Sequence, residues 1–182
     1  MMFFPQTANK HEALTYQLLG ASWHLVFMPK SLQVFYTNRQ LKKSTSERVG
    51  QLYTTDLTQP EVRVELATLL PANKSSFTRV SFDTKQAYQE RVMLLQQGFH
   101  FIGFWHTHPE GQPRPSSEDI LLITDHAKAA HQSLTGLIFV IVGNQSFPKG
   151  LFVGAHDCNR LLTMTQCPDN KATPLSTQNQ GF

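Results

Sequence analysis

The sequence predicts a single α/β domain with a mixed central sheet flanked by helices. Stretches with a two-residue apolar period alternate along the chain with stretches whose apolar residues recur at helical spacing, and this alternation is typical of α/β folds. The chain has 182 residues, of which 40% are apolar, so it can bury a core without disulfides. No internal repeat and no composition shift before residue 165 marks a second domain. We therefore expect one domain over residues 1–164.

The first half of the chain contains three predicted strands and one helix. Residues 23–27 favour a short strand, and Pro29 then begins a segment whose apolar residues lie near helical spacing as far as Leu41. Residues 49–54 and 61–66 alternate with period two, which predicts a strand in each.

The second half begins with a helix that Gly98 can end. Two strongly apolar runs follow, and such runs are typical of central, buried strands. In order, we expect a helix over 84–97, a strand over 99–105, a helix over 117–132, a strand over 137–143 and an edge strand over 151–153. Residues 165–182 are polar and contain two prolines, so we expect a disordered C-terminal tail there.

The composition excludes several classes of protein and predicts a cytoplasmic one. No apolar run approaches the roughly 20 residues of a transmembrane helix, and the N-terminus lacks the cationic and apolar regions of a secretory signal. The densest basic patch, at Arg39, Lys42, Lys43 and Arg48, is too loose for a nucleic-acid-binding stripe. We therefore expect neither a membrane nor a nucleic acid as a partner.

A metal half-site is predicted at the end of the strand over residues 99–105. His106 and His108 lie two residues apart, so an extended backbone directs both imidazoles to one face while Thr107 points toward packing on the other. A loop rich in proline and glycine follows, and Asp119 at the start of the next helix can then face the histidines. Two imidazoles and one carboxylate leave Zn²⁺ an open position for water, which is the layout of a catalytic site. Two cysteines are too few for a Cys₄ site.

Each part of this pattern also has a purely structural interpretation. Ser116 and Asp119 fit an N-terminal capping box, and the two histidines could be core residues. The combined spacing His-x-His-x₇-Ser-x₂-Asp should arise in only about one shuffled sequence per thousand, and a cap and a ligand are compatible roles. Other His-x-His enzymes fit less well, since a metallo-β-lactamase needs Asp and His directly after the pair and an amidohydrolase barrel needs about 250 residues.

The spacing resembles the signature of the JAMM (MPN+) metalloproteases, and residues 103–119 look most like the prokaryotic branch found beside ubiquitin-transfer-like enzymes. The resemblance runs over about residues 23–143 and implies a JAMM/MPN domain that binds Zn²⁺ through His106, His108 and Asp119. The family's upstream Glu-x-x-Gly-x-Leu matches the chain at Glu47, which the resemblance implies is the general base. It implies that Ser116 hydrogen-bonds the developing oxyanion or positions the water.

By this resemblance the chain is a zinc-dependent isopeptidase, similar to a deubiquitinase. In CBASS antiphage operons such proteins cleave the amide that joins the C-terminus of a cGAS-like nucleotidyltransferase to a target lysine. The implied partners are that nucleotidyltransferase or a ubiquitin-like protein, with a functional link to a ubiquitin-transfer-like enzyme. Two alternatives stay open: a deconjugase or precursor-processing peptidase for a bacterial ubiquitin-like modifier, and a non-catalytic MPN scaffold.

The sequence indicates the substrate groove less clearly than the metal ligands. An extended substrate tail could add as a strand beside the site, with the loops at 71–76 and 109–115 as candidate walls. Arg79 or Arg114 could meet substrate carboxylates or carbonyls, although a solvated surface charge is the competing interpretation. Phe77 and Trp105 are expected in the core.

The remaining acidic and imidazole side chains receive no role at the site. Glu61 and Glu65 are expected in a strand of their own, and Glu110 and Glu118 are expected to face solvent. The histidines without a role are His11, His24, His100, His126, His131 and His156.

Overall fold

The computed structural model describes residues 12–71, 83–130 and 134–168, and these ranges form two sheets and three helices. The larger sheet has the strand order β5-β3-β6-β7-β8-β9 and the smaller one the order β10-β1-β2-β4. The larger sheet comprises β3 (Val49–Thr54), β5 (Leu66–Ala67), β6 (His100–Thr107), β7 (Leu137–Val142), β8 (Leu151–His156) and β9 (Leu161–Thr163). The smaller sheet comprises β1 (Leu14–Gln17), β2 (His24–Phe27), β4 (Glu61–Val64) and β10 (Thr165–Gln166). The helices are α1 (Pro29–Thr37), α2 (Thr84–Gln96) and α3 (Ser117–Ala130).

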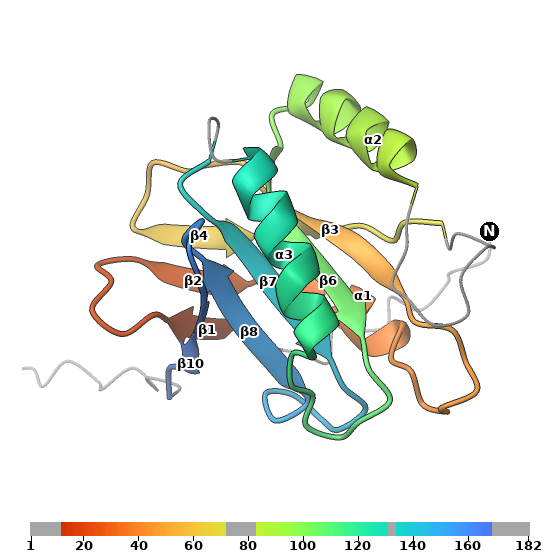
Figure 1. Cartoon of the computed structure of the whole chain (residues 1–182). Helices are drawn as coiled ribbons and strands as arrows, with labels where there is room; N and C mark the ends of the chain where they lie inside the picture. The colour runs from red at the N-terminus through yellow and green to blue at the C-terminus, as the bar shows by residue number, and fades with distance from the viewer. Residues whose placement is uncertain (1–11, 72–82, 131–133, 169–182) are drawn as a thin grey trace, which may run out of the picture.

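The larger sheet is the middle layer of the molecule. Helix α3 lies across one of its faces, and α1 lies on the other side (Figure 1). One buried cluster joins α1 and the smaller sheet to the larger sheet, and a second cluster joins α2 and α3 to the opposite face. Within the described ranges, no helix has the length and apolar character needed to cross a bilayer. The predicted α/β class with a mixed sheet and flanking helices is confirmed.

Strand β6 occupies the centre of the larger sheet and carries the first part of the candidate site. It pairs antiparallel with β3 and parallel with β7, so that His106 lies between Val49 and Ile141. Its side chains alternate between the layers: Trp105 contacts Phe35 of α1, whereas the ring of His106 packs on the α3 side. Both neighbouring strands, β3 and β7, are buried along their whole length, so the expected aromatic run forms a buried central strand.

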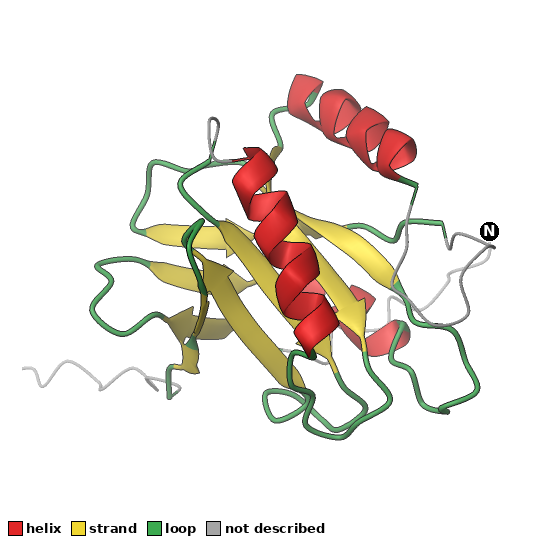
Figure 2. Cartoon of the chain, viewed as in Figure 1, coloured by secondary structure: helices red, strands yellow, loops and turns green. Residues whose placement is uncertain are grey.

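Several expected boundaries are wrong because a local cap or strand pairing decides them. The helix beginning at Pro29 ends at Thr37 rather than near Leu41, since the Asn38 side chain donates to the carbonyl of Val34. The strand expected over 61–66 is interrupted at Glu65, because the chain leaves the smaller sheet there and joins β3 in the larger one. Figure 2 shows the strands in yellow and the helices that flank them in red.

The C-terminal part of the chain also differs from the expectation. Strand β8 extends to His156 and is not an edge, since β9 pairs with it on the outer side. The expected tail begins too early, because Thr165–Gln166 pair with β1. Residues 169–182 lie outside the described residues, as do the last two residues of the helix expected over 117–132.

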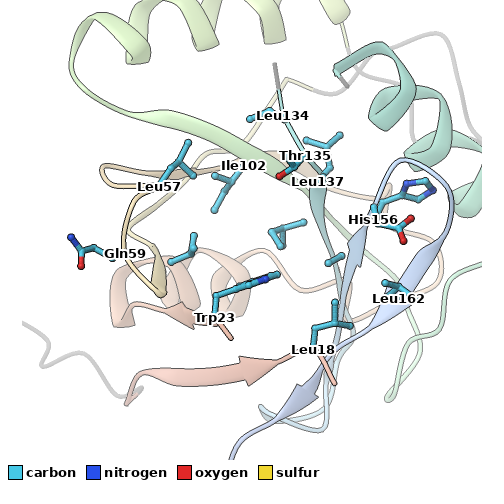
Figure 3. Close-up of a pocket in the computed structure, with 15 residues that line it drawn as sticks. Leu18, Trp23, Leu57, Gln59, Ile102, Leu134, Thr135, Leu137, His156 and Leu162 are labelled. Atoms are coloured by element: carbon cyan, nitrogen blue, oxygen red, sulfur yellow. The ribbon is translucent and has the colours of Figure 1, made fainter. Parts of the chain in front are cut away.

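A pocket of about 540 Å³ opens at the end of the larger sheet opposite His106. Its apolar lining includes Ile102 and Leu137 from the larger sheet, and Trp23 and Leu57 from loops between strands (Figure 3). Ile102 lies near the start of β6, whereas His106 lies near its end, so this pocket is separate from the candidate site.

Gly50 in β3 is required by close packing, and we expect Gly50→Ala to destabilise the fold by about 3 kcal/mol. A Cβ atom there would lie 1.8 Å from the carbonyl oxygen of Thr68 and 2.4 Å from Nε1 of Trp105. These two atoms are themselves hydrogen-bonded at 2.8 Å, so neither can move freely. Chemical denaturation measures the loss. The matched variant Gly20→Ala has open space and only an unfavourable φ of +82°, so it should cost about 1 kcal/mol. Equal stability of the two variants would contradict the packing argument.

Candidate metal centre

The end of β6 and the start of α3 bring three candidate ligands together. The Nε2 atoms of His106 and His108 lie 2.9 Å apart. The carboxylate of Asp119, in the first turn of α3, lies 3.1 Å from Nε2 of His106 and 3.4 Å from Nε2 of His108. One ligand atom from each residue falls within 4.8 Å of the others. The structure therefore brings together the three residues that the sequence predicts as metal ligands.

The donor set of this cluster fits a metal ion. His106 is 1% exposed and Asp119 5% exposed, while His108 is half-buried, so the cluster is enclosed on the core side and open on the other. Two unprotonated imidazole nitrogens at 2.9 Å repel each other unless a proton or a cation lies between them. Nitrogen ligands with one carboxylate oxygen are typical of zinc sites in which a further position stays open. His106, His108 and Asp119 can therefore hold a metal.

In the absence of a metal, Asp119 and His108 each shift the pKa of the other. Burial opposes ionisation of Asp119, but the hydrogen bonds from His106 and His108 outweigh it and hold the pKa of this carboxyl well below its usual range. Burial likewise opposes protonation of His108, and the neighbouring Asp119 carboxylate overcomes it, so the pKa of His108 is raised. The carboxylate is thus ionised and ready to bind a cation at neutral pH.

These shifts predict a limited pH range in which the cluster stabilises the metal-free fold. A raised pKa of His108 gives stability that is fully present below the ordinary value of 6.5 and is lost as the pH rises through the raised value. A lowered pKa of Asp119 gives stability that is present above the ordinary value of 3.8 and is lost as the pH falls through the lowered value. Both contributions to stability are therefore fully present between the ordinary pKa values of 3.8 for Asp119 and 6.5 for His108.

The measurement is the melting temperature of chelator-treated wild type and of Asp119→Asn across the acid and neutral range. The difference in favour of wild type is expected to be largest in mild acid and to shrink as the pH rises past the raised pKa of His108. A difference that does not change with pH would show that the two side chains are not coupled.

Ser116 caps α3 and holds Asp119. Its hydroxyl donates to Oδ2 of Asp119 at 2.7 Å and accepts from the backbone N–H of Asp119 at 3.1 Å, while its own backbone N–H donates to Oδ2 at 2.7 Å. The capping box and the ligand role therefore coexist, as the spacing predicts. The hydroxyl proton is engaged by Asp119, so the role of Ser116 at an oxyanion stays a prediction.

Glu47 lies in the loop before β3, beside the cluster. The next residue, Arg48, pairs with Thr107 at the end of β6: its backbone N–H donates to the Thr107 hydroxyl at 2.9 Å, and its carbonyl accepts from the Thr107 backbone N–H at 2.9 Å. Burial raises the pKa of Glu47, and the charges of His106 and His108 act in the opposite direction. A half-buried carboxylate within the field of both histidines is suitably placed for proton transfer.

The structure adds two residues to the site that sequence reasoning did not assign. Thr107 is fully buried, as packing predicts, but its hydroxyl also fixes the backbone next to Glu47. Glu110 faces solvent as expected, with 59% of its side chain exposed, yet its carboxylate lies 3.3 Å from Nδ1 of His108. A carboxylate two residues after a ligand histidine is the signal that could have indicated this contact.

The other expected residues fall outside the cluster. Glu61 pairs with Arg63, and Glu65 accepts from Thr55. Glu118 is exposed, as expected. Arg114 is also exposed, and its contact with a substrate stays a prediction. Trp105 is fully buried in the core, as expected. Phe77, Arg79 and residues 72–76 of the expected groove wall lie outside the described residues.

One family model and several solved structures are similar to this chain. Residues 32–152 match the model of the family described as prokaryotic homologs of the JAB domain. No curated protein matches the chain. Among solved structures, the chain is similar to protein DSY2949 from Desulfitobacterium hafniense, with 17% identity, a TM-score of 0.48 and coverage of 75% of this chain and 87% of that one. It is also similar to AF2198, a JAB1/MPN domain protein from Archaeoglobus fulgidus, with 15% identity, a TM-score of 0.39 and coverage of 72% and 87%.

The family match spans well over half of the chain and includes every residue of the cluster described above. The matched range begins within α1 and ends within β8, so it contains the central strands and all three ligands. The chain therefore belongs to the prokaryotic branch of the JAB/MPN domain family.

Proposed function

We propose that the chain is a zinc-dependent isopeptidase. Such an enzyme hydrolyses the amide that joins the C-terminus of one protein to a lysine Nε of another. The observation that carries the proposal is the convergence of His106, His108 and Asp119 beside the half-buried carboxylate of Glu47. Membership of the JAB/MPN family, which includes metalloproteases, supports the same reaction class. A scaffold domain without activity has no need for three converging ligands and an adjacent base.

The three ligands would hold the zinc ion through two imidazole nitrogens and one carboxylate oxygen. When bound, zinc supplies Lewis acidity that polarises a carbonyl and lowers the pKa of water toward about 7. Ser116 keeps the Asp119 carboxylate in place through two hydrogen bonds to Oδ2, and its hydroxyl accepts a third from the Asp119 backbone N–H. The burial of His106 and Asp119 keeps bulk water from the core side of the site.

Glu47 would move the proton in both halves of the reaction. Its carboxylate takes a proton from the attacking water as the new C–O bond forms at the amide carbon. It then gives that proton to the nitrogen as the C–N bond breaks, which releases a carboxylic acid and a lysine amine. The raised pKa of Glu47 that burial produces brings the group closer to the operating pH of such a transfer.

The substrate we propose is a protein conjugated through an extended C-terminus. The resemblance of residues 103–119 to the branch found beside ubiquitin-transfer-like enzymes supports a cGAS-like nucleotidyltransferase of a CBASS antiphage operon as the conjugated protein. A bacterial ubiquitin-like modifier is the alternative. A ubiquitin-transfer-like enzyme would then form the bond that this chain cleaves, with both acting in the cytoplasm.

Two purified conjugates test the proposal. One carries the nucleotidyltransferase C-terminus on a lysine, and the other carries a ubiquitin-like protein in the same linkage. Mass spectrometry should find a free C-terminal carboxylate and an unmodified lysine after incubation of the first conjugate with zinc-loaded protein. Cleavage of the second conjugate alone would assign the chain to modifier removal. Tight zinc binding without cleavage of either conjugate would overturn the proposal in favour of a scaffold.

A further inference from the structure

The loop that follows His108 is held at two consecutive carbonyls by one residue from a distant loop. Asn144, which follows β7, donates from its side-chain Nδ2 to the carbonyl oxygen of Pro109 at 2.6 Å. Its backbone N–H donates to the carbonyl oxygen of Glu110 at 2.8 Å. Asn144 therefore fixes the Pro109–Glu110 and Glu110–Gly111 peptide groups, which begin one residue after His108.

Asn144 is itself held in place. The guanidinium of Arg39, beyond the end of α1, donates to the Asn144 carbonyl at 3.3 Å. The preceding residue is Gly143, where a Cβ atom would lie 2.6 Å from the carbonyl oxygen of Glu110. The two loops thus approach more closely than a side chain at Gly143 would allow, and this close approach lets the short Asn144 side chain reach Pro109.

This arrangement affects both the backbone and the imidazole ring of His108. The backbone N–H of His108 donates to the carbonyl of Val142 at 2.9 Å, so the ligand is joined directly to the end of β7, two residues before Asn144. Glu110 Oε2 lies 3.3 Å from Nδ1 of His108. A carboxylate at Nδ1 favours the tautomer with a proton on Nδ1, which leaves the Nε2 lone pair free to face His106 and Asp119. The position of the Glu110 backbone therefore affects which nitrogen of His108 can bind a metal.

We propose that Asn144 is a positioning residue of the metal centre. Through the carbonyls of Pro109 and Glu110 it sets the direction of the His108 ring and keeps the Glu110 carboxylate at Nδ1. Asn144 acts only through this loop, since its two donors bind the carbonyls of Pro109 and Glu110 and not a metal ligand. The inference rests on the proposed metal site but not on the reaction carried out there.

The test is the zinc affinity of the full chain, measured by competition with a chelator, for wild type, Asn144→Ala and Asn144→Asp. Asn144→Asp keeps the shape of the side chain but replaces its N–H donor by a carboxylate oxygen, which repels the carbonyl of Pro109. Both variants are expected to bind Zn²⁺ about 10- to 100-fold more weakly than wild type, the usual effect of losing an outer-shell contact. The matched control is Gln17→Ala, which removes a hydrogen bond from the Gln17 side-chain amide, at the end of β1, to the carbonyl of Ala21 in the following loop. Its zinc affinity should equal that of wild type.

Circular dichroism and melting of the metal-free proteins show that each variant is folded, and affinity is compared among folded variants only. Unchanged zinc affinity in the folded Asn144 variants would overturn the proposal, and so would an equal loss in Gln17→Ala. Absence of zinc binding by wild type would overturn both this inference and the proposed function. If the Asn144 variants bind zinc more weakly, as expected, but wild type cleaves neither conjugate, the inference is supported and the proposed function fails.

Discussion

Replacing Glu47 by glutamine is expected to lower kcat for isopeptide cleavage about 10²- to 10⁴-fold while zinc binding persists. Glutamine has nearly the same shape but cannot accept the proton of the attacking water. The backbone next to it stays paired with Thr107, so the fold and the ligand cluster should be unaffected. The measurement is a rate assay at saturating conjugate and zinc, combined with zinc affinity of the same preparation.

A second carboxylate serves as the control for Glu47. Glu61 is exposed at the start of β4 and pairs with Arg63 on the surface, so Glu61→Gln should leave both kcat and zinc affinity at wild-type values. If Glu47→Gln also cleaves at the wild-type rate, Glu47 is not the base. If Glu47→Gln loses zinc affinity, its carboxylate contributes to the metal site rather than to proton transfer alone.

Replacing His106 by alanine is expected to abolish both zinc binding and cleavage. His106 supplies one of three ligand atoms and is 1% exposed, so water cannot take its place without entering the core. The loss of zinc affinity should exceed the roughly 10- to 100-fold typical of an outer-shell change. The measurement is chelator competition, with the melting temperature of the metal-free variant as the check on folding.

His100, at the other end of the same strand, is the matched control. It is partly exposed and lies outside the ligand cluster, so His100→Ala should keep zinc affinity and cleavage. Persistence of tight zinc binding in His106→Ala would show that the metal is held elsewhere, and the proposed site would be wrong.

The central part of the fold could be predicted from sequence because its strands carry their own signal. Strands β6 and β7 are long and apolar on both faces, which only a central sheet position accommodates. Strands β1, β9 and β10 were not predicted, since each has only two to four residues and is defined by its partner strand. The same reason explains the break at Glu65, where the chain changes sheets.

The ligands of the candidate site were predictable because local geometry determines them. A spacing of two in an extended strand places His106 and His108 on one face, and the capping box fixes Asp119 in the first turn of α3. Thr107 and Asn144 could not be assigned in the same way. Their contacts depend on loops that only the tertiary structure brings together, and neither residue type is distinctive in sequence.

The proposed function requires that the cluster of His106, His108 and Asp119 holds a metal that is needed to cleave an isopeptide bond. The most direct measurement is cleavage of a lysine-linked conjugate by metal-stripped protein before and after addition of an equimolar amount of Zn²⁺. We predict no cleavage by the stripped protein and full recovery with zinc. Cleavage that continues at the same rate without metal would contradict the claim.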